Sequence, residues 1–168
     1  MSADQRYSGV RFSKSESTPL YVSRTDPLNL LSSYSKHGFE LDGDAWPSVE
    51  HYYQGMKFKP GELRNAIRDA DHPAKAKKLA AKNKKSVRND WKQVKETIMT
   101  RGIYIKCRTH PEAADALLAT NEQKIIENSQ FDYYWGCGRD GRGHNTFGKI
   151  LMAVRERLRE ERSATERP

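Results

Sequence analysis

Residues 44–58 decide the fold of this chain: Asp44-Ala45-Trp46-Pro47-Ser48-Val49-Glu50-His51-Tyr52-Tyr53-Gln54-Gly55-Met56-Lys57-Phe58. Pro47 and Ser48 predict a helix start, because a serine hydroxyl at the N-cap accepts a hydrogen bond from an unpaired backbone N–H group of the first turn. The helix is expected to stop near residues 60–61, where a proline and a glycine follow each other. Its apolar side chains share a side that we expect to be buried: Val49, Tyr52 and Met56.

Three polar side chains of this helix form one stripe, because residues three and four apart in a helix lie one above the other. Glu50, Gln54 and Lys57 place a carboxylate, an amide and an amine in a row, close to the aromatic Trp46 and Tyr53. Such a row is either the wall of an active site or an exposed, ion-paired edge. The helix by itself leaves both interpretations open.

Length and composition fit one intracellular domain. The 168 residues suffice for a single core, and the eight Tyr, five Phe and three Trp argue against general disorder. No apolar run approaches the roughly 20 residues that span a bilayer, and no secretory signal is recognised. Cys107 and Cys137 form neither a disulfide framework nor a metal-binding pattern. We therefore expect a cytoplasmic protein (or a nuclear one, if eukaryotic) with no membrane partner, no metal and no cofactor.

The net charge of +8 is concentrated in the middle of the chain. Residues 57–108 contain 16 Lys and Arg against 5 Asp and Glu, an excess of 11. A basic zone raises the local concentration of anionic partners such as nucleic acid, nucleotides or sugar phosphates. The alternative is a solvated basic face that has no specific partner.

The order of patterns predicts a mainly α-helical fold with a small β component. Residues 1–18 are interpreted as a flexible arm, 19–160 as a single compact domain and 161–168 as a frayed end. A strand is expected at 19–22, and alternation that ends in Asp-Gly predicts a hairpin at 38–44. Beyond the helix that starts at Ser48, we expect helices at 63–70, 73–82, 90–108, 111–120 and 146–162, with a short strand near 125–126.

A second unusual segment, residues 133–148, is rich in glycine and precedes the last predicted helix. Five glycines within thirteen positions allow the backbone to approach a ligand and to present N–H groups to it. The helix start that follows favours an anion, and Trp135 offers a surface on which a base or sugar can stack. The segment is therefore interpreted as a ligand-binding loop, with a flexible surface loop as the alternative.

Taken together, four ordered motifs resemble the NADAR family. The resemblance extends over residues 20–158 and is most specific in the Glu-His-Tyr and Trp-Gly segments. Its motifs are Trp46-Pro-Ser-Val-Glu50-His51-Tyr52-Tyr53-Gln54-x-x-Lys57-Phe58, Arg88-Asn-Asp-Trp91, Leu117-Leu118-Ala-Thr120 and Asp132-x-Tyr134-Trp135-Gly136-x-Gly138-x-Asp140-Gly141-x-Gly143-x-Asn145-x-x-Gly148-x-x-Leu151-Met152-x-x-Arg155.

This resemblance implies a mostly helical domain that hydrolyses N-glycosidic bonds. Known family substrates are of two kinds: ADP-ribose joined to the amino group of guanine, and ribosylamino-pyrimidine phosphates of early riboflavin synthesis. The chain departs from the family pattern at two places. Riboflavin-type members have Trp-Gly-Asp-Gly where this chain has Cys137, and the common Ser-Asn-Phe corresponds here to Ser32-Ser33-Tyr34.

Breaking a ribosyl C1–N bond requires stabilisation of positive charge at C1, a proton for the departing amine and a water nucleophile. Sugar hydrolases commonly divide these tasks between two carboxylates. We assign Glu50 as the essential carboxylate, either polarising water or shielding the cationic sugar, and Asp140 as a weaker candidate for a second acid. Lys57 is expected to act as a nucleophile through a Schiff base on the ring-opened sugar, or as an electrostatic partner of phosphate or Glu50.

The remaining candidates would bind substrate. Trp135 and Trp91 are expected to flank the base or ribose, although Trp91 has a core position as its alternative role. Arg88 and Lys106 are candidates for the phosphates. Close backbone or polar contacts are assigned to Gly136, Gly138, Asn145, Ser32 and Tyr34.

Three functions are therefore carried forward. The first is an N-glycosidase that removes ADP-ribose from guanine bases, with an ADP-ribose-containing substrate and possible contact with nucleic acid. The second is an N-glycosidase that acts on riboflavin intermediates, with a sugar phosphate as substrate. The third, from a different class, is a non-catalytic module that binds ADP-ribose or nucleic acid.

Overall fold

The helix predicted from residues 44–58 is present and lies at the centre of the molecule. In the computed structural model, which describes residues 18–167, helix α1 (Val49–Gly55) begins at the predicted N-cap, where the Ser48 Oγ accepts a hydrogen bond from the His51 N–H at 3.2 Å. All seven of its residues are buried. The helix ends earlier than expected, and Trp46 packs against that end, where a Cβ on Gly55 would lie 2.5 Å from the indole.

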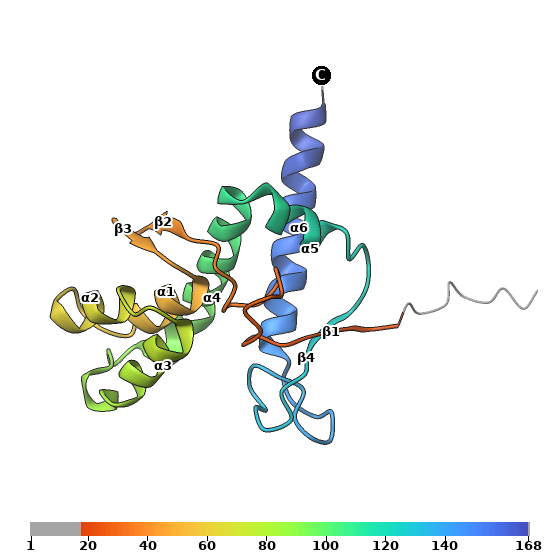
Figure 1. Ribbon diagram of the computed structural model, residues 1–168. Coiled ribbons are helices and arrows are strands. Elements are labelled where there is room, and N and C mark those ends of the chain that lie inside the picture. The colour runs from red at the N-terminus through yellow and green to blue at the C-terminus, as the bar shows by residue number, and fades with distance from the viewer. Residues whose placement is uncertain (1–17, 168) are drawn as a thin grey trace, which may run out of the picture.

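Four short strands form two separate two-stranded sheets (Figure 1). β2 (Phe39–Leu41) and β3 (Asp44–Trp46) make the predicted antiparallel hairpin, and Asp42 and Gly43 both have positive φ at its turn. β1 (Leu20–Val22) and β4 (Ile125–Glu127) are the two other predicted strands. They pair in parallel with Leu20 opposite Ile125, a pairing that the sequence did not indicate. This pairing joins the beginning of the described chain to the segment that leads into the glycine-rich loop.

The main core lies between α1 and three C-terminal helices. Helix α4 (Trp91–Thr109) packs against α1, α5 (Pro111–Leu118) and α6 (Thr146–Glu166), and α6 also covers β4. Figure 1 shows α6 as the long blue helix beside α4 and α5. Tyr52, Ile103, Leu117, Ile125 and Leu151 are almost completely buried in this core. It holds α1 and the β1–β4 pair in fixed positions.

A smaller unit extends from α1. Helices α2 (Glu62–Arg68) and α3 (Pro73–Ala81) form a yellow-green wing in Figure 1, followed by the short 3-10 helix η1 (Lys84–Ser86) within the predicted basic loop. The wing encloses a second, smaller hydrophobic cluster formed by Phe58, Ile67, Ala76 and Ala80. We call this unit the α2–α3 wing.

The fold is mainly α-helical with a small β component in one compact domain, as predicted. The last helix is longer than expected: α6 continues through Glu166, beyond the expected end at residue 162. Charged pairs along the helix, such as Arg157–Glu161 and Glu156–Arg159, support the last turns. Except for Thr18, the predicted arm lies outside the described residues. In the part of the chain that the structure describes, no helix is both long and apolar enough to cross a membrane.

Candidate active site

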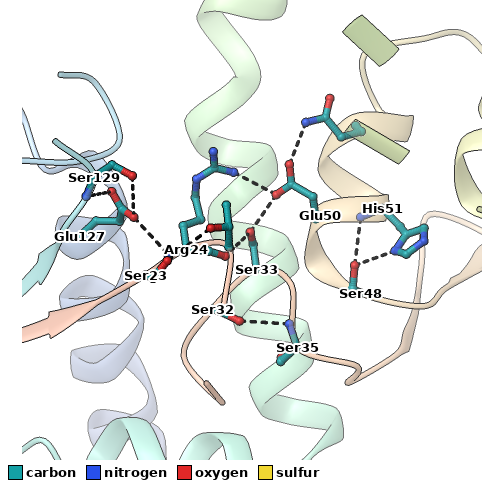
Figure 2. Close-up of polar contacts among 12 residues, drawn as sticks. Ser23, Arg24, Ser32, Ser33, Ser35, Ser48, Glu50, His51, Glu127 and Ser129 are labelled. Carbon is teal, nitrogen blue, oxygen red and sulfur yellow. Dashed lines mark hydrogen bonds and ion pairs between the residues drawn. The ribbon is translucent and has the colours of Figure 1, made fainter. Parts of the chain in front are cut away.

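Glu50 is fully buried and receives three hydrogen bonds (Figure 2). Its Oε2 accepts from Arg24 Nη1 at 3.0 Å and from Ser33 Oγ at 2.8 Å, and its Oε1 accepts from Gln54 Nε2 at 2.8 Å. Two members of the predicted stripe, Glu50 and Gln54, therefore lie inside the protein. The interpretation of this row as an exposed, ion-paired edge is excluded.

Backbone contacts hold the partners of Glu50 in place. Ser33 accepts the Glu50 N–H at its carbonyl (2.9 Å) and donates its own N–H to the Arg24 carbonyl (3.0 Å). Arg24 follows β1, and its N–H donates to Oε1 of Glu127 at the end of β4 (3.1 Å). Glu127 also accepts from the N–H and hydroxyl of Ser129. Figure 2 shows this continuous network, which extends from Ser129 through Arg24 to Glu50. The parallel β1–β4 pair therefore positions the arginine.

Arg24 and Glu50 form an ionised pair in the interior. Burial by itself would raise the pKa of Glu50, but the charge of Arg24 and the hydrogen bonds from Gln54 and Ser33 outweigh it, so the pKa lies below its usual value. Burial would likewise lower the pKa of Arg24, yet the carboxylate of Glu50 raises it above the usual value. At neutral pH the site therefore holds a desolvated carboxylate and a desolvated guanidinium that stabilise each other.

An aromatic wall borders this pair. The rings of Tyr53 and Trp135 meet edge to face at 5.6 Å between centroids, and Trp91 lies 5.0 Å from Tyr53. Arg24 Cζ lies 5.9 Å from the centroid of the Trp135 ring. The structure thus brings both predicted tryptophans to the same tyrosine. Trp135 is fixed in turn by Asp132, whose Oδ1 accepts its backbone N–H at 2.8 Å.

Lys57 reaches the same aromatic wall from the end of α1. Its Nζ lies 5.4 Å from the Tyr53 ring centroid and 5.8 Å from that of Trp91. Burial lowers the pKa of Lys57 and Glu50 opposes this, while Arg24 and the lysines at positions 77 and 95 lower it further. A lowered pKa increases the fraction of neutral, nucleophilic amine at neutral pH.

Tyr34 also lies near Glu50 and Arg24. Its side chain is almost completely buried, and burial, together with the negative charge of Glu50, raises the pKa of its phenol to about 12. Tyr34 therefore stays protonated and can donate a hydrogen bond near the carboxylate.

In the glycine-rich segment, three residues that were predicted to contact a ligand make contacts within the protein. Asn145 is buried, its Oδ1 accepting the Glu127 N–H (2.8 Å) and its Nδ2 donating to the Ile125 carbonyl (2.9 Å). A Cβ on Gly136 would lie 2.4 Å from Oε2 of Glu127, and one on Gly138 would lie 2.4 Å from the Tyr133 ring. Asn145 and Gly136 therefore hold the loop against β4, and Gly138 packs against Tyr133 within the loop.

Asp140 lies at the exposed tip of the loop. Its carboxylate accepts the Arg142 N–H at 3.1 Å and lies 3.9 Å from the Arg142 guanidinium, with about half of the side chain exposed. These contacts are local, and we no longer propose Asp140 as the second acid.

Lys106, a candidate for phosphate binding, and Ser32, a candidate for a polar substrate contact, both make hydrogen bonds within the fold. Lys106 is buried and uses all three of its donors, on the carbonyls of Leu30 (2.7 Å) and Ser32 (2.9 Å) and on Ser35 Oγ (3.0 Å). The Ser32 hydroxyl accepts the Ser35 N–H. All three donors of Lys106 are therefore used within the fold, and both Lys106 and Ser32 support the turn that carries Ser33.

Arg88 is next to the site through its backbone, since its N–H donates to the carbonyl of Lys57 at 2.9 Å. Its guanidinium pairs with Asp90 and borders a cavity of about 550 Å³ that also has Phe58 and Val87 in its walls. Glu50 does not line this cavity. Arg88 therefore remains a peripheral candidate.

Sequence reasoning missed Arg24 and Ser33. Arg24 lies just after the predicted strand at 19–22, and nothing near it in the sequence indicates a partner for Glu50. Ser33 lies between the two chosen residues Ser32 and Tyr34, at the position where the family pattern has Asn. This replacement of Asn by Ser33 was the sequence feature that could have drawn attention to the position. Within residues 18–167, no group of three or more His, Cys, Asp or Glu side chains could hold a metal ion.

Comparison with known proteins gives this arrangement its context. The family model of the NADAR domain matches residues 11–159, most of the chain. The chain belongs to the NADAR family. N-glycosidase YbiA of Escherichia coli is 35% identical over 138 residues, which cover 82% of this chain and 86% of YbiA. N-glycosidase Npun_R5314 of Nostoc punctiforme is 37% identical over 142 residues, covering 83% and 91%.

The fold agrees with this membership. The NMR structure of E. coli YbiA superposes with a TM-score of 0.76 at 33% identity, covering 89% of each chain. Riboflavin biosynthesis protein VVA0006 of Vibrio vulnificus is 34% identical over 143 residues, covering 84% of this chain and 39% of that longer protein. As a NADAR N-glycosidase, the protein is a hydrolase that acts on N-glycosyl bonds.

Proposed function

We propose that this NADAR protein hydrolyses the ribosyl C1–N bond that joins ADP-ribose to guanine in nucleic acid or nucleotides. The observation that carries the proposal is the buried, ionised Glu50 beside the aromatic wall of Tyr53, Trp91 and Trp135, which Lys57 also reaches. This arrangement offers a negative charge for a cationic sugar and flat surfaces for a base or ribose.

In the direct route, the C1–N bond breaks and its electron pair goes to the guanine amine, while Glu50 stabilises the positive charge that develops at C1. Water adds to C1 and its proton is transferred to the leaving amine. In the alternative route, the ribose ring opens so that the guanine nitrogen forms an imine at C1. The neutral amine of Lys57 then adds to C1, its protons pass to the guanine amine, and that amine leaves as the C1–N bond breaks. Water hydrolyses the Schiff base that remains between Lys57 and C1. The lowered pKa of Lys57 supports the second route, and the ionised Glu50 serves both.

Positive charge near Lys57 supports a substrate that carries phosphate. Lys77 on α3 and Lys95 on α4 lie close enough to lower its pKa, and Lys95 Nζ lies 3.7 Å from the ring centroid of Tyr134. These lysines take the place of Lys106 as candidates for the diphosphate of ADP-ribose.

A second candidate substrate is a ribosylamino-pyrimidine phosphate of riboflavin synthesis. The observation that favours it is the similarity to riboflavin biosynthesis protein VVA0006. The same carboxylate, amine and aromatic wall would act on its C1–N bond, with a pyrimidine as leaving group.

The deciding experiment offers both substrates to the purified protein, ADP-ribosylated guanine in a DNA oligonucleotide and the ribosylamino-pyrimidine phosphate, and follows the products by mass spectrometry. We expect release of ADP-ribose from the oligonucleotide. The Glu50→Gln variant should lose at least about 100-fold in rate, whereas the matched exposed variant Glu160→Gln should keep full activity. Cleavage of the pyrimidine substrate alone would favour the second candidate. Binding of ADP-ribose without cleavage of either substrate would indicate a non-catalytic module, and full turnover by Glu50→Gln would contradict the assignment of Glu50.

A further inference from the structure

The amide of Gln54 has a bonded end and an unpaired end. Its Nε2 donates to Glu50 Oε1 at 2.8 Å, which fixes the orientation of the amide because a carboxylate accepts only from the nitrogen. The Oε1 therefore points away from that carboxylate oxygen. It is buried, in a residue that is 3% exposed, and no donor within the described residues reaches it. An unpaired buried carbonyl is destabilising, so a native site normally supplies its donor from a ligand or a water.

Arg24 contributes the opposite kind of group on the other side of the carboxylate. A guanidinium has five N–H donors. Among residues 18–167, the Arg24 guanidinium makes one hydrogen bond, to Glu50 Oε2, while its planar group lies over Trp135. Its other N–H groups have no hydrogen-bond partner among these residues and remain as donors beside the carboxylate.

The three side chains consequently form an ordered row: N–H donors on Arg24, the carboxylate of Glu50 and the open acceptor of Gln54 (Figure 2 shows the Arg24–Glu50 part). Adjacent hydroxyl groups match such a row, because each hydroxyl both donates and accepts. A phosphate does not match it, because its oxygens would meet Glu50 and Gln54 acceptor to acceptor.

The positions of Arg24 and Gln54 relative to C1 also indicate that their ligand is a pair of adjacent hydroxyls. If Glu50 faces C1, as the proposed function requires, the atoms next to C1 lie beside its neighbours Arg24 and Gln54. In a ribose, the carbon next to C1 carries the 2-hydroxyl and the following carbon carries the 3-hydroxyl, while the other ring neighbour of C1 is the ring oxygen. Hydrogen bonds to the 2-hydroxyl strengthen in the transition state of glycoside hydrolysis.

We propose that Gln54 and Arg24 are specificity-determining residues that bind the 2- and 3-hydroxyls of the ribose whose C1–N bond is cleaved. Gln54 Oε1 accepts from one hydroxyl, and the free N–H groups of Arg24 donate to the diol from the opposite side. This inference rests on the proposed function and adds that the enzyme distinguishes ribose from deoxyribose at the reacting sugar.

The test measures binding of the product, ADP-ribose, and of its analogues that lack the 2- or the 3-hydroxyl on the terminal ribose, by calorimetry. The wild-type protein is expected to bind at least one deoxy analogue about tenfold or more weakly than ADP-ribose. In Gln54→Met, which has no acceptor at this position, the ratio of the ADP-ribose affinity to the deoxy-analogue affinity should fall several-fold below the wild-type ratio, and the part that remains is assigned to Arg24. The exposed Gln93→Met is the matched control and should keep the wild-type ratio.

The contribution of Arg24 is measured in a background that keeps the pocket neutral. Arg24→Met alone would leave Glu50 buried without a counter-charge, so the change is made in Glu50→Gln. If Arg24 binds the diol, the double variant should discriminate between ADP-ribose and the deoxy analogues several-fold less than Glu50→Gln alone. Equal discrimination by the single and double variants would remove Arg24 from the site.

The ratio of the wild-type affinities for ADP-ribose and its deoxy analogues tests the inference even if a variant fails to fold, because it requires no substitution. Deoxy analogues that bind the wild type within about twofold of ADP-ribose would overturn the inference and assign the open acceptor to an ordered water. In that outcome, continued cleavage of ADP-ribosylated guanine would leave the proposed function intact. Absence of both ADP-ribose binding and cleavage would overturn the proposed function together with this inference.

Discussion

At the scale of single residues, Glu50 gets its chemical character from its neighbours. A buried carboxyl group on its own would resist ionisation, but Arg24, Ser33 and Gln54 all direct donors at it. The carboxylate is therefore both charged and fixed in direction before any substrate arrives, which is the preorganisation that electrostatic catalysis requires.

Lys57 provides the first prediction at this scale. Sodium borohydride added during turnover should reduce a Schiff base and leave a stable adduct on Lys57, because burial favours its neutral amine. Peptide mass spectrometry locates the adduct. Lys57→Arg should abolish the mass shift, and Lys59→Arg, an exposed lysine two residues away, should retain it. If the wild type shows no mass shift at Lys57, the Schiff-base route fails and the direct route remains.

Lys106 provides a prediction about pH and stability. Burial lowers the pKa of its ammonium from 10.5 to about 8, with a small opposing contribution from Cys107. Between these two values the unfolded chain still binds this proton and the folded protein has released it. The unfolding free energy should therefore rise with pH from about 8 to about 10.5, by up to roughly 3 kcal/mol from this group.

Urea unfolding at several pH values in this range measures the effect. Lys106→Met is the comparison, because it removes the titrating group from the same buried position. The wild type should gain stability relative to this variant as the pH rises. A constant difference between the two proteins would show that Lys106 is not the source of the pH dependence.

At the scale of secondary-structure elements, the site depends on how closely α6 approaches β4. A Cβ on Gly148, in the first turn of α6, would lie 2.2 Å from the carbonyl oxygen of Ile125. That oxygen also accepts the Asn145 amide, and the neighbouring Glu127 holds Arg24. The glycine at this position therefore permits a backbone contact on which the β1–β4 pair and the active site depend.

Gly148→Ala tests this contact. The methyl group would meet main-chain atoms that cannot move independently, so we expect a loss of about 1–3 kcal/mol in unfolding free energy and a fall in activity as Arg24 shifts. Thermal and urea denaturation measure the first, and the hydrolysis assay the second. Lys149→Ala, at the exposed neighbouring position, should change neither. Wild-type stability in Gly148→Ala would show that α6 can move away from β4 without consequence.

Local elements were predictable because local interactions determine them. The Ser48 cap, the Asp42-Gly43 turn and the proline at the start of α3 each act within a few residues. The length of α1 was not predictable in the same way. It ends at Gly55, where Trp46 packs closely against the helix, and this contact depends on the position of the hairpin rather than on helix propensity.

At the scale of the whole molecule, the two hydrophobic clusters differ in size. Twenty-one buried residues form the main core, whereas four form the cluster of the α2–α3 wing. Regions with few buried apolar contacts open more readily than the central core. The wing also carries Lys77, which lies near the active site.

Hydrogen exchange should reveal this difference. Amides of α2 and α3 are expected to exchange at least about tenfold faster than those in the centres of α4 and α6, because the wing can open without disrupting the main core. Mass spectrometry of peptides from native-state exchange measures the rates. Ligand binding at Lys57 and Lys77 should slow exchange in α3. Equal protection of the wing and the core would mean that the protein opens only as one cooperative unit.

Sequence patterns were enough to predict the helices, the hairpin and the family, and to propose Glu50, Lys57, Trp91 and Trp135 as members of one candidate site. Capping, turn chemistry and periodicity are local, so they can be recognised in a single chain. Long-range contacts were needed to pair Arg24 with Glu50, to bury Lys106 and Asn145 against backbone groups, and to leave Gln54 Oε1 without a donor among residues 18–167. These roles depend on a parallel strand pair that places Arg24 against Glu127, 103 residues away, and on which buried polar groups then find partners.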